Sequence, residues 1–228
     1  MSKDNTKERK KREKEARRNV ILESAKKLFI NLGFENTTMK NIAIEAELSK
    51  GSLYNYFKSK DDLYLAVATI AIREINNTCE KIDRTGKTDL EQILSTGYVL
   101  YEFSKNHPDL VSIADDYLFL RSKHFFEDIH QKSINGETLN RNEQEIYNEN
   151  LRYEKLIFDP ISKAIDNKSI RDDLSPMLIM ATLASLTSGL IYDLRRTEAL
   201  YENMGVKNDE IIDIVFEWVA EGLKPRKK

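Results

Sequence analysis

Apolar residues recur at steps of three and four along most of the chain, and this spacing predicts helices from about residue 20 onward. Gly33 stands where the first helix should end, because glycine readily takes the left-handed conformation of a helix terminus. Two short helices are predicted next, over about residues 39–46 and 50–57, with Thr38 and Ser49 as N-caps. The first apolar run consists of Val20, Ile21, Ala25, Leu28, Phe29 and Leu32.

Longer helices follow, and their ends are marked by capping residues and prolines. We find no internal repeat and no stretch that indicates a strand, so the predicted fold class is all-α. The boundary signals are a capping-type start at Ser59–Asp62, a capping box at Thr88–Glu91, a helix start at Pro108, a turn at Asn135-Gly136, a kink at Pro160, a start at Ser175-Pro176 and an N-cap at Asn208.

Charge is distributed unevenly along the chain, although the formal net charge is only −2. Residues 1–60 carry a net charge of +7 and the remainder carries −9. Residues 1–15 are rich in Lys, Arg and Glu without apolar periodicity, and we interpret them as a flexible basic arm. A basic front favours a polyanionic partner, although a solvated charged tail would have the same composition.

The composition also leads us to expect that several kinds of site and segment are absent. A single cysteine, Cys79, excludes an intramolecular disulfide and a Cys-rich zinc site, and no His pair has metal-binding spacing. We therefore expect neither a metal nor another cofactor. We also expect no membrane-spanning segment and no secretory signal peptide, which leads us to expect a soluble, cytoplasmic protein.

Two short helices joined by a tight turn and preceded by a longer helix form a helix-turn-helix DNA-reading unit. Gly51 and Ser52 are small enough for close approach to DNA, and Tyr54, Asn55 and Tyr56 are predicted to stay outside the core. Tyrosine hydroxyls can donate to phosphates, and their rings can contact thymine methyl groups. Lys50, Lys58 and Lys60 supply positive charge. The predicted core consists of Leu28, Phe29, Ile42, Ala43, Ala46, Leu48, Leu53 and Phe57.

Over residues 21–67 the sequence resembles the TetR family of bacterial transcriptional regulators. The resemblance includes the helix ending in Leu-Phe and Gly-Phe, the Thr-Thr helix start, and the segments SKGSLYNYF and KSKDDL. It implies a homodimer that represses transcription from a palindromic operator until a small-molecule inducer binds. The family's DNA-contacting positions fall on Thr38, Lys50, Ser52, Tyr54, Asn55, Tyr56 and Lys60.

The expected organisation is therefore a basic flexible arm over 1–15, a DNA-binding domain over 16–60, and a larger helical ligand-binding and dimerisation domain over 61–228. No family motif identifies the ligand. Aromatic residues are dense between residues 98 and 158, and inward-facing members could line an apolar pocket, although any one of them could be ordinary core. The candidate ligand-binding residues are Tyr98, Tyr101, Phe125 and Tyr192.

Residues 178–194 are apolar nearly all round and include a side built of small residues, which would let a partner helix approach closely. Together with the last helix, this segment could form a four-helix interface across a two-fold axis. The candidate interface residues are Ser185, Ser188, Ile212 and Phe216.

Two alternatives remain. The C-terminal domain could serve only for dimerisation or for binding a protein partner, and a filled core in place of a pocket would favour that reading. An enzyme is disfavoured, because the sequence has no Gly-rich phosphate loop, no Gly-x-Ser-x-Gly and no His-Glu-x-x-His motif.

Overall fold

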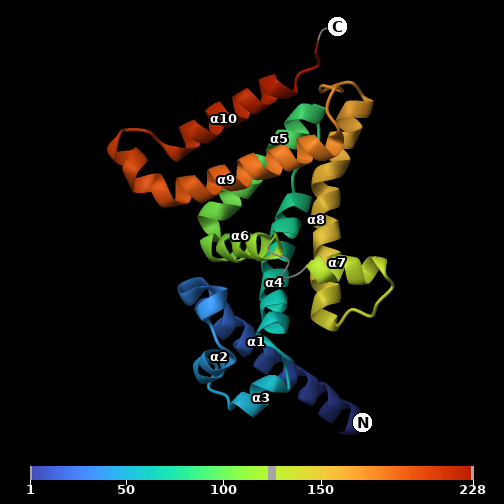
Figure 1. Cartoon of the computed structure of the whole chain (residues 1–228), viewed down its shortest axis with the longest axis vertical. Helices are drawn as coiled ribbons and strands as arrows, with labels where there is room; N and C mark the ends of the chain where they lie inside the picture. Colours follow the sequence, from blue (N-terminus) through green and yellow to red (C-terminus); the bar gives the residue numbers. More distant parts are fainter. Residues whose placement is uncertain (1, 123–126, 227–228) are drawn as a thin grey trace. The chain divides into compact units, whose positions relative to one another are not determined.

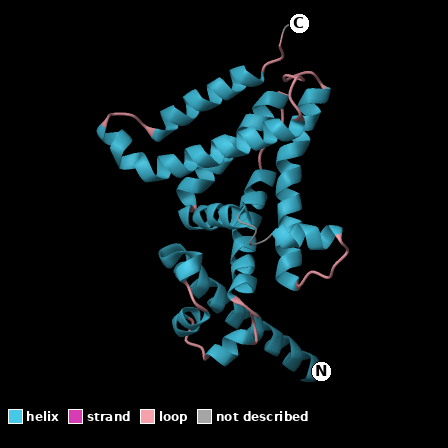
Figure 2. Ribbon diagram, in the orientation of Figure 1, coloured by secondary structure: helices cyan, strands magenta, loops and turns pink. Residues whose placement is uncertain are grey.

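The computed structural model describes residues 2–122 and 127–226, and within them the chain is helical with no strand (Figures 1 and 2). This agrees with the predicted all-α fold class. The described helices are α1 Ser2–Asn36, α2 Met39–Glu45, α3 Lys50–Tyr54, α4 Lys60–Glu80, α5 Asp89–Asn106, α6 Pro108–Ser122, α7 Glu127–Ile134, α8 Arg141–Asp166, α9 Pro176–Asn203 and α10 Asn208–Leu223.

The chain forms two compact units. Unit 1 comprises residues 1–72 and 109–149, and unit 2 comprises residues 73–108 and 150–228. Helices α4 and α8 each contribute residues to both units. This grouping differs from the boundary at residue 60 drawn from the sequence motif, because α6, α7 and the start of α8 belong to the same compact unit as α1–α3.

Helix α1 begins at Ser2, so residues 2–15 of the predicted flexible basic arm are helical in the structure. Residues 2–15 have no apolar periodicity of their own. They extend α1 outward from its C-terminal half, which is anchored in unit 1 by apolar residues. Ile21, Ala25 and Phe29 are almost fully buried in unit 1. Gly33 breaks the helix with φ +76°, as predicted. Thr37, which is fully buried, then donates its hydroxyl to the carbonyl of Gly33 at 2.7 Å and satisfies an orphan acceptor at this end.

The two short helices begin where their caps predict. The Thr38 hydroxyl accepts from the backbone N–H of Asn41 at 3.2 Å, and the Ser49 hydroxyl accepts from that of Ser52 at 3.1 Å. Helix α3 ends at Tyr54, three residues before the predicted end. Ile42, Leu53 and Phe57 are fully buried, whereas the predicted core members Leu28 and Leu48 are only partly buried.

In unit 2, helices α5, α9 and α10 pack together, and the C-terminal half of α8 contributes to the same core. The core is built on Ile93, Ile161, Ala164, Ile170, Ile179 and Leu223. The predicted starts at Thr88 and Ser175 are confirmed by their cap hydrogen bonds. Asn208 is not the N-cap of α10: Lys207 holds that position, and its backbone N–H donates to the Glu210 carboxylate at 3.2 Å.

Helix α9 is long and apolar enough, by length and composition, to cross a membrane, which differs from the expectation that no such segment exists. Only 22% of its apolar window is buried. Its buried residues Ile179, Thr187, Ile191 and Leu194 lie on one face. Elsewhere on α9, large apolar residues are exposed within a single chain, among them Leu178, Leu186 and Tyr192. Exposed apolar residues that gather in one patch are typical of an interaction surface.

Candidate functional site

The outward face of α3 and the residues after it form the candidate DNA-reading surface. Leu53 and Phe57 are fully buried and fix the orientation of this short segment. Tyr54 is 43% exposed, Asn55 is exposed and Tyr56 is half-buried. The structure therefore exposes Tyr54 and Asn55, as the sequence predicted, and covers Tyr56 in part, on a segment held by two apolar anchors.

Four other predicted DNA-contacting residues lie near this segment. The Lys50 ammonium lies 5.9 Å from the centre of the Tyr54 ring. The Ser52 hydroxyl is 2.8 Å from that of Ser49, and Gly51 is exposed at the surface. Thr38 is exposed at the start of α2, where its side chain takes part in the capping box with Asn41. These residues cluster at the starts of α2 and α3.

Lys60 makes contacts inside the protein. Its ammonium donates to the backbone carbonyls of Phe34 at 2.7 Å and Glu35 at 3.4 Å, and it lies 4.2 Å from the centre of the Phe34 ring. A cation at this place balances the partial negative charge at the end of α1. The predicted phosphate contact would therefore have to share the ammonium with two protein carbonyls.

A buried amide at the start of α8 joins parts of unit 1 that are far apart in sequence. The Arg18 guanidinium donates to Asn142 Oδ1 at 3.0 Å, and Asn142 Nδ2 donates to Asp62 Oδ1 at 2.8 Å. Arg18 also stacks 5.1 Å from the centre of the Phe57 ring. Burial, together with the nearby charge of Arg141, lowers the pKa of Arg18 from its ordinary value. Asn142 thus links α1, α4 and α8, and no local sequence signal marks it.

These contacts border a polar cleft of about 330 Å³ that also includes the reading segment. It is lined by Lys14, Glu15, Arg18, Tyr54, Asn55, Tyr56, Lys58, Asp62, Asn140, Arg141 and Asn142. Basic residues of α1 therefore share one cleft with Tyr54, Asn55 and Tyr56.

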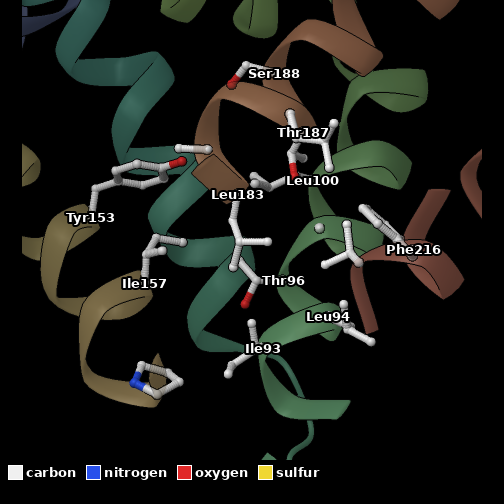
Figure 3. Close-up of a pocket in the computed structure, with 15 residues that line it drawn as sticks. Ile93, Leu94, Thr96, Leu100, Tyr153, Ile157, Leu183, Thr187, Ser188 and Phe216 are labelled. Atoms are coloured by element: carbon white, nitrogen blue, oxygen red, sulfur yellow. The ribbon is translucent and has the colours of Figure 1, made fainter. Parts of the chain in front are cut away.

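A second, apolar pocket lies in unit 2 (Figure 3). Its volume of about 50 Å³ is small compared with the several hundred Å³ of a typical small-molecule site. No charged side chain lines it, and its polar groups are the hydroxyls of Thr96, Tyr153, Thr187 and Ser188. The apolar lining includes Ile93, Leu94, Leu100, Ile157, Leu183 and Phe216. Helices α5, α8, α9 and α10 all contribute to the wall (Figure 3).

The candidate ligand-binding residues Tyr98, Tyr101 and Tyr192 do not line this pocket. The Tyr98 hydroxyl donates to Asp213 at 3.1 Å and the Tyr101 hydroxyl donates to Asp209 at 2.8 Å. Burial and then these carboxylates raise the pKa of both phenols, which stay neutral donors. Tyr192 is exposed and accepts a hydrogen bond from Arg196 at 2.6 Å. Phe125 lies outside the described residues. The pocket is instead lined mostly by aliphatic residues, together with Tyr153 from the aromatic-rich stretch and Phe216.

Two of the four candidate interface residues are buried within their own chain. Ile212 is 2% exposed and Phe216 is 4% exposed, so neither leaves surface for a second chain. Phe216 packs against Gly97 and Tyr98 of α5 and lines the pocket. Ser188 is half-buried and lines the pocket, whereas Ser185 is exposed. The exposed apolar residues of α10 are Ile214 and Trp218.

Cys79 is buried, and burial raises its thiol pKa to about 11. A thiol of this kind is a poor nucleophile at neutral pH, which fits a packing role for Cys79. Among the described residues, no group of three or more His, Cys, Asp or Glu side chains could hold a metal ion.

Comparison with known proteins agrees with this geometry. The family "Bacterial regulatory proteins, tetR family" matches residues 21–67. The regulator YhgD of Bacillus subtilis is 29% identical over 100 residues, which cover 44% of this chain and 52% of YhgD. The chain therefore spans about half the length of this curated relative, and it spans about a third of two others from the same organism, YuxN and YfiR.

Solved structures extend the likeness to the whole fold. A TetR-family regulator from Marinobacter aquaeolei matches with a TM-score of 0.67 at 17% identity, covering 95% of this chain and all of that one. The regulator FadR of Bacillus subtilis, solved with stearoyl-CoA, matches with a TM-score of 0.61 at 13% identity and covers 90% and 98% of the two chains. Residues 21–67 therefore match the tetR family, and the chain as a whole has the fold of solved TetR-family regulators.

Proposed function

We propose that the protein is a ligand-responsive, dimeric repressor that binds a palindromic operator in the cytoplasm and leaves it when a small molecule binds. The observation that carries this proposal is the Tyr54-Asn55-Tyr56 segment, in which Tyr54 and Asn55 are exposed. The segment is held by the buried anchors Leu53 and Phe57 and lies within the residues that match the tetR family. Tyr54 and Asn55 would contact base edges and phosphates, and Lys50 would add a charge-assisted phosphate contact.

The test is operator binding measured by fluorescence anisotropy, using DNA from upstream of the protein's own gene and a scrambled duplex. Tyr54→Ala should weaken specific binding by about tenfold or more, in line with the loss of one base or phosphate contact. Tyr54→Phe tests the hydroxyl alone. Its matched control is Tyr98→Phe, which removes another partly exposed tyrosine hydroxyl, in unit 2. Equal binding to operator and scrambled DNA by the unaltered protein would contradict the proposal.

Dimerisation would use the exposed apolar face of α9 and α10. Leu178, Thr182, Ser185, Gly189 and Tyr192 recur at steps of four and three, so they form one stripe, and all five are exposed. Small residues at 182, 185 and 189 would let a second copy's helix approach closely, and Ile214 and Trp218 of α10 would flank it. A dimer would present two reading segments to the two halves of a palindrome.

The ligand would enter the unit 2 pocket. Its uncharged, hydroxyl-bearing lining suits the apolar part of a slender molecule, and FadR, a structural neighbour, was solved with stearoyl-CoA. A ligand that widened this pocket would displace α8 or α9. Helix α4 also contributes to both units, so a tilt of α4 would alter the spacing of two reading segments in a dimer. Half-sites must lie about 34–36 Å apart, so a small change would lower affinity.

The small pocket volume specifically favours the second candidate function, in which unit 2 only dimerises or binds a protein partner. A fluorescent apolar probe, N-phenyl-1-naphthylamine, separates the two. The small-molecule sensor is supported if the probe binds saturably and stearic acid displaces it. Leu183→Trp should then abolish probe binding, because the indole fills the pocket. No binding of the probe, and operator affinity unchanged by stearic acid or stearoyl-CoA, would favour the second function.

A further inference from the structure

The N-terminal half of α1 carries a continuous basic face. Lys7, Lys10, Lys14 and Arg17 recur at steps of three and four, and Lys11 and Arg18 lie beside them on the same side of the helix. With a rotation of about 100° per residue, Glu8, Glu13 and Glu15 fall to the two flanks of this face. Arg9 and Arg12 fall opposite it. Lys7, Lys10, Lys11, Lys14 and Arg17 are all exposed.

This basic face continues the side of α1 that faces the core. Ile21, Ala25 and Phe29, which are buried in unit 1, lie on the same side of the helix one to three turns further along. The same side is therefore apolar in the half of α1 that is buried in unit 1 and basic in the N-terminal half. Figure 1 shows this N-terminal half extending past α3. The basic part of this side begins where the apolar part, which is buried in unit 1, ends. It is therefore suited to a negatively charged partner.

The rotation of this face relative to the reading segment is fixed by contacts within unit 1. Arg18 is held by the Asn142 amide at 3.0 Å and by the Phe57 ring at 5.1 Å. Lys14, one turn earlier, lines the same cleft as Tyr54, Asn55 and Tyr56. The basic face and the reading segment are thus open to the same side of unit 1.

We propose that residues 7–18 of α1 form a second DNA-contacting element, which binds the phosphate backbone of duplex DNA flanking the half-site that α3 reads. This inference rests on the proposed function. At about 1.5 Å per residue the element is about 16 Å long, which corresponds to roughly five base pairs of duplex. Lysine and arginine at these positions add affinity and salt dependence without base specificity.

The test compares two double variants that each remove two positive charges from the same stretch of helix. Lys10→Gln/Lys14→Gln neutralises the basic face, and Arg9→Gln/Arg12→Gln neutralises the opposite side. Operator affinity is measured between 50 and 200 mM salt on a duplex with ten flanking base pairs and on one trimmed to the half-sites. Circular dichroism confirms equal helix content.

On the long duplex, the slope of log affinity against log salt should fall by about two for Lys10→Gln/Lys14→Gln, because each phosphate contact contributes about 0.9. It should change much less for Arg9→Gln/Arg12→Gln. Trimming the flanks should weaken the unaltered protein and leave Lys10→Gln/Lys14→Gln nearly unaffected. Sequence preference should survive in every variant, since α3 is intact.

Specific operator binding with equal slopes for both double variants would overturn this inference and leave the proposed function standing. Absence of any sequence-specific binding by the unaltered protein would instead contradict the proposed function. The inference would also be wrong if Lys10→Gln/Lys14→Gln lost only the binding to phosphatidylserine vesicles, because the basic face would then serve a membrane.

Discussion

Lys60 illustrates how a residue that is predicted to contact DNA can also stabilise the fold. Its ammonium bonds the carbonyls of Phe34 and Glu35 and lies over the Phe34 ring. Lys60→Met keeps the apolar stem and removes the charge. We expect the free energy of unfolding in urea to fall by about 1–2 kcal/mol, because hydrogen bonds from a charged donor contribute about that much.

The matched change is Lys58→Met, at an exposed lysine two residues away, which should cost less than about 0.5 kcal/mol. If Lys60→Met lost operator affinity while keeping full stability, the ammonium would contact DNA phosphate directly, as the family positions imply, and its contact with α1 would carry little energy.

At the scale of the element, Gly97 and Phe216 determine how α5 and α10 pack. A Cβ at position 97 would lie 2.5 Å from Cζ of the Phe216 ring, which is nearly fully buried. Gly97→Ala gains about 1 kcal/mol of helix propensity and incurs about 1–3 kcal/mol of overpacking. We therefore expect a net loss of up to about 2 kcal/mol, measured by denaturant unfolding.

The double variant Gly97→Ala/Phe216→Leu identifies the cause. If the ring is the obstacle, the two changes together should cost less than the sum of their separate effects, since leucine leaves room for the new methyl group. Strict additivity would show that Phe216 can move aside, and the pocket beside it would then be more deformable than its volume indicates.

Most helix starts were predictable from the sequence because their signals are local. The Thr38, Ser49, Thr88 and Ser175 caps each bond a backbone N–H three residues onward, and the Gly33 break needs only a positive φ. Asn142 could not be found in this way. Its partners Arg18 and Asp62 are 124 and 80 residues distant, and only the fold brings them to its amide.

The candidate site likewise has one part that local sequence signals predict and one part that they do not. The reading segment was predictable because the buried anchors Leu53 and Phe57 are four residues apart and determine what faces outward. The pocket was not, because aromatic density does not indicate which of several helices a side chain faces. Tyr98 and Tyr101 pair with carboxylates on α10, and Phe216, predicted to contact a second chain, lines the pocket.

At the scale of the whole molecule, the exposed apolar stripe on α9 leads to a prediction about assembly. Ser185→Arg places a long cation in the middle of the stripe, where the proposed partner helix approaches most closely. It should shift a dimer toward monomer in sedimentation velocity at micromolar concentration, because the charge would be buried without a partner. Thr85→Arg adds the same charge at an exposed position before α5 and should leave assembly unchanged. Ser188→Arg is a poorer probe, since Ser188 also lines the pocket.

Trp218 reports on the same face from the other helix. It is the chain's single tryptophan, and 68% of it is exposed in an isolated chain. A dimer through α9 and α10 would cover the indole, so its emission should be blue-shifted and protected from iodide at high protein concentration, and Ser185→Arg should remove both effects. The opposite result is a protein that sediments as a dimer while iodide quenches its indole equally at all protein concentrations. That result would show that the two copies contact each other through another surface.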